Sequence, residues 1–272
     1  MSLCDCGRGV TLSETRNNPA VDHSNREYRQ MRYELFYWPG IQGRGEFIRL
    51  ALEEAGADYV DVARLPERDG GGMRAMNRWL EDASVKRPPF APPFLKAGRL
   101  VIGQTANILQ YLGPRLDLAP KDDAARLWAH QLQLTVTDML VEAHDVHHPI
   151  ASALYYHDQK PEAQRRAPHF TGERIPKFLD YFEAVLMGSS KGKGFMLGRT
   201  LTYVDLSMFQ VVAGLRYAFP NAMARLADEY PSLIGLHERV AARPNIAAYL
   251  ASERRIPFNQ HGIFRHYPEL DA

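Results

Sequence analysis

The stretch Pro88–Leu95, PPFAPPFL, lies just upstream of GRLVIGQTANILQYLG at residues 98–113. The second of these segments has the pattern of a short strand followed by a helix. Proline has no backbone N–H to donate to a sheet ladder, so four prolines at the entrance of a strand do not serve sheet stability. This proline entrance, residues 88–93, therefore indicates that the backbone before the strand is left unpaired for another purpose.

The residues around this entrance predict an α/β domain over residues 31–115. PFLKAG and RLVIGQ predict a hairpin with Ala97-Gly98 as its turn, and TANILQYLGPRL predicts a helix that Gly113-Pro114 ends. Upstream, YELFYW, RGEFIRLALEEAGA and YVDVAR predict a strand, a helix and a second strand, which suggests a βαβ unit with a parallel pair. A short helix is expected around residues 73–80.

The rest of the chain predicts an all-helical domain over residues 121–255, followed by a tail at 256–272. Apolar residues recur at helical spacing through most of this half, and no clear strand appears. The expected fold class is therefore an α/β domain with a mixed sheet, followed by an all-α domain. The segments with helical spacing are residues 121–148, 157–187, 201–219 and 231–251.

The start of one helix is well marked by LTYVDL at residues 201–206. Thr202 and Asp205 match a capping box, in which each side chain accepts a hydrogen bond from the other's backbone N–H. We interpret this motif as a folding signal worth about 1 kcal/mol.

Composition predicts a substantial core and a small or neutral ligand. The chain has 272 residues, of which 45% are hydrophobic, enough for one large domain or two modest ones. Lys and Arg number 33 against 32 Asp and Glu, and the net charge of +1 favours neither nucleic acid nor an anionic membrane as partner. Apolar runs such as Leu206–Leu215 fall short of the roughly 20 residues that a membrane span needs.

The two cysteines, Cys4 and Cys6, both lie in a polar N-terminal segment. Residues 1–30 have neither the apolar core of a signal peptide nor the acid-poor composition of a transit peptide, so we expect a cytoplasmic protein. We also expect this extension to be disordered, because the first patterned segment begins at Met31. The folded part then has no thiol, which disfavours mechanisms that need an enzyme cysteine.

Three segments, in this order and in these contexts, resemble the cytosolic glutathione transferase family. They are FYWPGIQGRGEFIRLALEEAG at 36–56, PPFLKAGRLVIGQTANILQYLG at 92–113 and FMLGRTLTYVDLSMF at 195–209. The resemblance is to tyrosine-type members (the alpha, mu, pi and sigma classes) in a bacterial-like form. It implies a thioredoxin-like domain that binds glutathione, a helical domain that shapes a site for a second substrate, a homodimer, and no cofactor besides glutathione as co-substrate.

The resemblance assigns the proline entrance to glutathione binding. Pro93 matches a cis-proline whose preceding residue, here Pro92, offers its backbone to the cysteinyl part of glutathione like an added strand. Pro92 has no N–H to give, so one of two backbone hydrogen bonds, nominally worth about 0.5–1.5 kcal/mol, is missing. Gln104 and Thr105 match the polar pair that opens the next helix, where Thr105 and the helix N-terminus hold the γ-glutamyl carboxylate.

Tyr37 matches the phenol that, in tyrosine-type members, donates a hydrogen bond to the glutathione sulfur. A free thiol has a pKa of about 8.5, and a donor aimed at the sulfur favours the thiolate. Arg44 is a candidate for electrostatic support of the thiolate, and Trp79 and Lys86 match positions for the glycyl end. Trp38 alternates to the other face of the strand, where we expect it in the core.

The residues expected at the pocket for the second substrate are Ile41, His144, His148 and Tyr155. His144 and His148 are one helical turn apart, with His147 beside them, so three interpretations stay open: a metal site, a pocket lining with acid–base assistance, and structural histidines. Pro149 ends the regular helix and no HExxH motif is present, so we expect no metal. The aromatic C-terminal tail either closes over the pocket as a lid or packs on the surface.

The expected function is transfer of the glutathione thiolate to an apolar electrophile, as in detoxification. Phe90, in the proline entrance, is expected either to insert into a partner subunit or to pack in its own domain. The alternatives to the transferase are a glutathione-dependent isomerase, which uses the same thiolate and returns it, and a non-catalytic ligand-binding or structural relative.

Overall fold

The computed structural model describes residues 31–272, so the expected N-terminal extension with Cys4 and Cys6 lies outside the described residues. A four-stranded sheet has the order β2-β1-β3-β4. β1 is parallel to β2 and antiparallel to β3, and β3 is antiparallel to β4, so the sheet is mixed, as predicted. The strands are β1 (Tyr33–Phe36), β2 (Tyr59–Asp61), β3 (Phe94–Ala97) and β4 (Leu100–Gly103).

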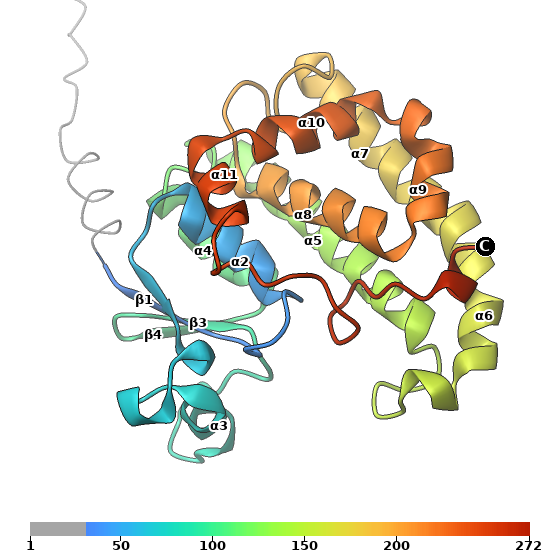
Figure 1. Cartoon of the computed structure of the whole chain (residues 1–272). Helices are drawn as coiled ribbons and strands as arrows, with labels where there is room; N and C mark the ends of the chain where they lie inside the picture. The colour runs from blue at the N-terminus through green and yellow to red at the C-terminus, as the bar shows by residue number, and fades with distance from the viewer. Residues whose placement is uncertain (1–30) are drawn as a thin grey trace, which may run out of the picture.

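Three helices cover the two faces of the sheet (Figure 1). α2 (Gly45–Glu54) and α4 (Thr105–Arg115) lie on the face turned toward the helical half, and α3 (Gly72–Glu81) lies on the opposite face. On the α3 side, Met76 is buried in a small apolar cluster with Phe36 and Phe94. Alternate residues of β1 therefore serve two different cores.

The second half of the described chain is helical, which confirms the fold class predicted from the sequence. Its helices are α5 (Asp123–His147), α6 (Lys160–His169), α7 (Ile175–Ser190), α8 (Tyr203–Ala218), α9 (Pro220–Leu226), α10 (Pro231–Ala241) and α11 (Pro244–Leu250). The tail, residues 256–272, runs from α11 along the helical half and ends near α6 (Figure 1). Within residues 31–272, no helix is both long and apolar enough to cross a membrane.

Some element boundaries differ from those predicted. α4 runs through Gly113-Pro114 to Arg115, because a proline in the last turn removes a single intrahelical bond and the Leu116 N–H still reaches the Leu112 carbonyl at 2.9 Å. The strand expected over residues 59–64 stops at Asp61, and residues 62–64 form a 3₁₀ turn that buries two consecutive apolar side chains. The helix expected over 157–187 is divided by a π-helical turn at 170–174, and α9 was not predicted.

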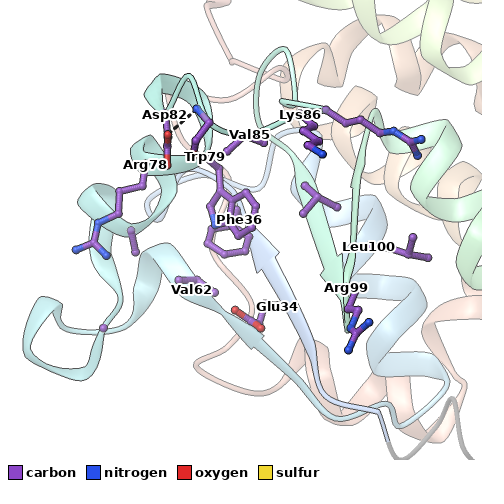
Figure 2. Close-up of a pocket in the computed structure, with 15 residues that line it drawn as sticks. Glu34, Phe36, Val62, Arg78, Trp79, Asp82, Val85, Lys86, Arg99 and Leu100 are labelled. Atoms are coloured by element: carbon purple, nitrogen blue, oxygen red, sulfur yellow. Dashed lines mark hydrogen bonds between the residues drawn. The ribbon is translucent and has the colours of Figure 1, made fainter.

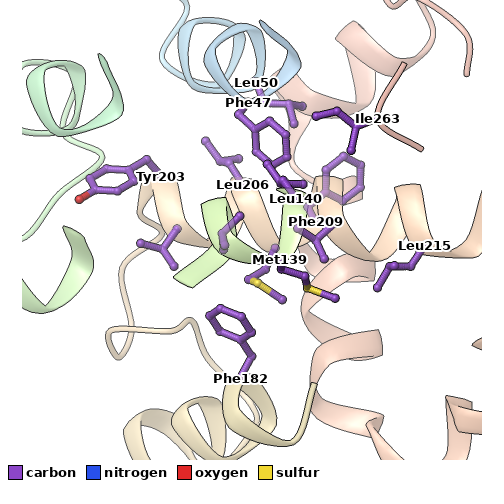
Figure 3. Packing of buried hydrophobic residues seen from close by; sticks show 14 of the residues in the cluster. Phe47, Leu50, Met139, Leu140, Phe182, Tyr203, Leu206, Phe209, Leu215 and Ile263 are labelled. Atoms are coloured by element: carbon purple, nitrogen blue, oxygen red, sulfur yellow. The ribbon is translucent and has the colours of Figure 1, made fainter. Parts of the chain in front are cut away.

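One apolar core runs from the sheet half into the helical half. Figure 3 shows Phe47 and Leu50 of α2 near Leu206 and Phe209 of α8, with Ile263 of the tail beside them. All five side chains are buried, and each large apolar side chain contributes about 1.5–3 kcal/mol when it leaves water. α2 thus packs against both the sheet and α8. The predicted domain division near residues 115–121 stays a prediction.

The predicted capping box at the start of α8 is confirmed. The backbone N–H and the hydroxyl of Thr202 donate to Asp205 Oδ2 at 2.7 and 2.8 Å. Asp205 Oδ1 accepts from the N–H of Met196 at 2.7 Å, which ties the preceding loop to the helix. Burial raises the pKa of Asp205 to about 6, and these hydrogen bonds oppose the rise.

Asp205→Ala should lower the free energy of unfolding by about 3 kcal/mol or more, because it leaves three buried donors without an acceptor. Equilibrium urea unfolding followed by circular dichroism measures the change. Asp228→Ala, at an exposed position, is the matched control and should change the value by less than about 0.5 kcal/mol. Equal unfolding midpoints for the two variants would contradict this account of the cap.

Candidate active site

Strand register brings three segments to one end of the sheet. Phe36 pairs with Phe94 across β1 and β3, and Phe94 pairs with Gly103 across β3 and β4. The residues one step beyond these pairs are Tyr37, Pro93 and Gln104. The phenol, the proline entrance and the start of α4 therefore meet where three neighbouring strands end.

The hydroxyl of Tyr37 lies inside the turn that joins β1 to α2. It accepts a hydrogen bond from the backbone N–H of Arg44 at 2.9 Å, and no residue within 31–272 accepts the hydroxyl's own proton. Burial raises the pKa of Tyr37, and the Arg44 N–H opposes the rise. The phenol thus stays protonated at neutral pH, with a proton to donate.

Two glycines leave room for this phenol. A Cβ on Gly43 would lie 2.1 Å from the Tyr37 hydroxyl oxygen, and a Cβ on Gly45 would lie 2.5 Å from ring carbon Cδ1. Gly43 also has a φ of +42°, in the region that favours glycine. The turn is therefore shaped around the Tyr37 side chain.

The proline entrance and the start of α4 adjoin the phenol. The Pro92–Pro93 peptide bond is cis, as predicted. Gln104 has φ 68° and ψ 122°, a conformation that residues with a side chain rarely adopt and that is often found at functional sites. Thr105 begins α4, and its hydroxyl donates to the carbonyl of Arg44 at 3.4 Å. This contact sets the N-terminus of α4 beside the Tyr37 turn.

A buried ion pair fixes the other side of the turn. Arg49 Nη1 lies 3.2 Å from Glu46 Oε2, and Arg49 Nε lies 2.7 Å from Asp61 Oδ2. Nη1 also donates to the carbonyls of Ile41 and Gln42 at 3.3 and 3.4 Å. Burial by itself lowers the pKa of Arg49, but the attraction of Asp61 and Glu46 outweighs it, so the pKa is raised and the guanidinium stays charged.

The same polar network crosses into the helical half. Glu46 Oε1 accepts from the Tyr249 hydroxyl at 2.7 Å and from the Arg255 guanidinium. Arg255 also donates to the Gln210 side chain at 3.0 Å, and Gln210 donates to the Gln42 side chain at 2.7 Å. The turn after β1 is therefore held from both halves of the chain.

The C-terminal tail packs across the space between this turn and the end of α5. Asn259 Nδ2 donates to the carbonyl of Gly40 at 2.8 Å, and Gln42 Nε2 donates to the carbonyl of Ile256 at 2.5 Å. His147 Nε2 lies 2.8 Å from the carbonyl of Ile263. The tail thus covers the region where the sequence predicted the second pocket.

Three histidines gather at the end of α5. The ring centroids of His144, His147 and His148 lie 4.7 to 5.0 Å apart, and the Nδ1 atoms of His147 and His148 are 2.5 Å apart. Burial lowers the pKa of all three, to about 2 for His147 and about 4 for His148, so the rings are neutral at pH 7. The structure therefore brings two of the residues expected at the second pocket together.

The other two residues of that expected pocket lie apart from the histidine pair. Ile41 is half-buried in the turn after β1, and Tyr155 is exposed, with its ring stacked on His157 at 5.5 Å. The expectation for Trp38 was wrong, since it is 39% exposed. β1 ends at Phe36, so Trp38 lies in the turn, where the alternation of strand faces no longer applies.

Trp79 and Lys86 lie on the α3 side of the sheet. Figure 2 shows both at a cavity of about 810 Å³, into which Phe36 also projects. Trp79 packs edge-on against Phe36 and Phe94, with ring centroids 6.3 and 6.5 Å apart. Neither Tyr37 nor Thr105 lines this cavity, so the structure does not bring Trp79 and Lys86 into the cluster at the strand ends.

Comparisons with known proteins agree with this architecture. A family model described as Glutathione S-transferase, C-terminal domain, matches residues 144–253. The chain is 26% identical to Glutathione S-transferase P 1 of Xenopus laevis, over 82% of this chain and 93% of that protein. A solved pi-class glutathione S-transferase of Onchocerca volvulus has a TM-score of 0.62 at 21% identity, covering 80% of this chain and 91% of the other. The chain is similar to cytosolic glutathione S-transferases in both sequence and fold.

The similarity to these relatives extends along most of the described chain. The chain is also 23% identical to a Glutathione S-transferase of Plasmodium falciparum, over 81% of this chain and 96% of that protein.

Sequence patterns did not predict the buried polar network, which is formed by Gln42, Glu46, Arg49 and Asp61. A signal was present, because Glu46 and Arg49 are opposite charges one helical turn apart on a helix rich in apolar residues. The same spacing is common on exposed helix faces, so it does not by itself indicate a buried pair. Glu46 and Arg49 are buried because α8 and α11 pack against α2.

Arg49→Leu should lower the free energy of unfolding by about 3–5 kcal/mol, because Glu46 and Asp61 then lose their buried partner. Urea unfolding measures the loss. Arg254→Gln, which breaks an ion pair with Glu53 at a position 57% exposed, is the control and should lose less than about 1 kcal/mol. Losses of equal size in both variants would refute the special weight given to the buried pair.

Proposed function

We propose that the chain is a glutathione transferase in which the Tyr37 hydroxyl stabilises the glutathione thiolate. The observation that carries the proposal is the state of that hydroxyl, which accepts from the Arg44 N–H and keeps its own proton for an external acceptor. A hydrogen bond to a charged group contributes about 1.5–3 kcal/mol, which lowers the thiol pKa by roughly 1–2 units. The bound thiol is then largely ionised at neutral pH.

Glutathione is held at three places in this proposal. Thr105 and the first N–H groups of α4 bind the γ-glutamyl carboxylate, because a helix N-terminus attracts anions. The Pro92 carbonyl accepts from the cysteinyl N–H, and the absent Pro92 N–H weakens binding by about 0.5–1.5 kcal/mol. Trp79 and Lys86 are proposed for the glycyl end, because their cavity borders Phe36, the residue before Tyr37.

The proposed reaction is attack of the thiolate on an electrophilic carbon. A carbon–sulfur bond forms, and the leaving group departs with its electron pair. Proximity of the two bound substrates and the preformed thiolate supply the rate. The residues proposed around the second substrate are Ile41, His144, His148 and Tyr155, with Arg44 supporting the thiolate charge and the tail as cover.

The proposal requires no cofactor besides the co-substrate thiol. The co-substrate has to be a reduced thiol, and the cytosol keeps thiols reduced. We therefore place the reaction in the cytoplasm.

Tyr37→Phe should raise the pKa of bound glutathione by roughly 1–2 units and lower kcat/KM about 10- to 100-fold at neutral pH. Thiolate absorbance during titration with glutathione gives the pKa, and conjugation of a chromogenic aryl halide gives the rate. Tyr33→Phe, on the same strand but at its other end, is the matched control.

The control variant should keep the thiolate signal and the rate. Binding of glutathione without a thiolate signal in the unmodified protein would support a non-catalytic relative instead. A thiolate signal without conjugation of any electrophile, but with turnover of an isomerisable substrate, would support the isomerase.

We also propose a homodimer. Phe90 is 94% exposed in the proline entrance, although a phenyl group in water is unfavourable. On α5, Leu127, Leu134 and Val141 are exposed and recur every seventh residue, so they share one face of the helix. A second copy of the chain is the partner that covers both features in this proposal.

Leu134→Glu should shift the protein toward monomer and Phe90→Ser should weaken the dimer at least tenfold, because each removes apolar area from the proposed contact. Sedimentation velocity over a range of concentrations measures both shifts. Met187→Gln, at a half-exposed apolar position on α7, is the control and should leave the distribution unchanged. A monomeric unmodified protein at all concentrations would exclude the homodimer.

A further inference from the structure

We propose that His144, His147 and His148 form a binding site for a divalent transition-metal ion such as Zn²⁺. One ring nitrogen from each residue lies within 4.8 Å of the other two. His144 and His147 occupy positions i and i+3 of α5 and share one face of the helix, and His148 directly follows the last residue of α5. The proposed transferase reaction needs no metal, and His144 and His148 are also among the residues proposed around its second substrate.

The hydrogen bonds around the cluster determine which ring nitrogens are available. His147 donates its Nε2–H to the carbonyl of Ile263 at 2.8 Å, so its neutral ring presents a lone pair on Nδ1. His144 Nδ1 lies 3.4 Å from Asp145 Oδ1, which leaves Nε2 of His144 for a ligand. A backbone carbonyl and a carboxylate are the partners that usually orient metal-binding histidines.

The chemistry of the cluster selects for particular metals. Three neutral imidazoles suit Zn²⁺, Ni²⁺ or Cu²⁺, whereas Mg²⁺ and Ca²⁺ prefer oxygen ligands. Three protein ligands leave a fourth coordination position open, and His144 is partly exposed, so solvent reaches the site. Arg44 and Arg265 are positively charged, as the metal ion is, and oppose its binding near the rings. The negative charge of Asp145 favours binding.

Binding requires a small movement of one ring. With metal–nitrogen distances of about 2.0–2.1 Å in a tetrahedral site, two ligand nitrogens lie roughly 3.3 Å apart. The Nδ1 atoms of His147 and His148 are 2.5 Å apart, so His148 moves outward by less than about 1 Å and carries its proton on Nε2. His148 follows the last residue of α5, where helix geometry no longer restrains it.

The features that led us to expect no metal do not oppose this site. The HExxH motif belongs to a catalytic zinc site of another kind, in which two histidines lie on one helix. Pro149 ends α5, and His148, at φ −135° and ψ 58°, lies with its ring 5.0 Å from that of His144. The backbone at the end of α5 therefore places His148 beside His144.

The test uses the full chain without an affinity tag, treated with a chelator and then titrated with Zn²⁺ in a calorimeter and with Co²⁺ in a spectrophotometer. Because Cys4 and Cys6 are also metal-binding residues, the titration is repeated with both replaced by serine. The expected result is one equivalent bound in both proteins, with visible Co²⁺ bands of four-coordinate type and no thiolate charge-transfer band. Mg²⁺ and Ca²⁺ should not compete.

Ligand variants decide whether these histidines hold the ion. His144→Gln and His148→Gln should each weaken Zn²⁺ binding at least tenfold, and His169→Gln, at an exposed position on α6, should leave it unchanged. His147→Gln is a third ligand variant, provided that the protein folds. If it does not fold, the His144 variant still tests the site, because the His144 side chain is partly exposed and its replacement disturbs the core less. The proposal would be overturned if the His144 and His148 variants bound Zn²⁺ with unchanged affinity, or if replacement of Cys4 and Cys6 by serine abolished Zn²⁺ binding.

Discussion

The buried guanidinium of Arg49 holds together the elements that form the site. It is buried between carboxylates from α2 and β2, and it also holds two carbonyls of the turn after β1. A buried charge is tolerated only where its partners are in place. Helix, strand and turn are therefore fixed relative to one another, and in this arrangement the Arg44 N–H donates to the Tyr37 hydroxyl.

Two kinds of contact join the halves of the chain at this site. Apolar packing of α2 against α8 contributes stability, because it buries large side chains (Figure 3). The polar network from Glu46 through Arg255 and Gln210 to Gln42 supplies direction, because hydrogen bonds require defined angles. The turn beside Tyr37 is thus positioned by residues far away in the sequence.

The tail links two chemically distinct clusters. At one end, the Ile256 carbonyl accepts from Gln42 in the turn after β1, and at the other end, the Ile263 carbonyl accepts from His147 at the end of α5. Hydrogen bonds at both ends hold this segment across the region between the sheet half and α5. A change in the histidine cluster therefore acts on the same segment that packs against the turn.

Local patterns in the sequence predicted the succession of most strands and helices and the capping box at Thr202, because these depend on residues close together in the chain. The cis bond before Pro93 was predicted from the resemblance to a family of proteins, and strand register brings Tyr37, Pro93 and Gln104 together. Four features depend on packing between distant segments: Arg49 is buried, Trp38 is exposed, Trp79 lies on the α3 side of the sheet, and His147 is hydrogen-bonded to the Ile263 carbonyl. Burial and partners at these positions come from segments distant in the sequence, so no local pattern encodes them.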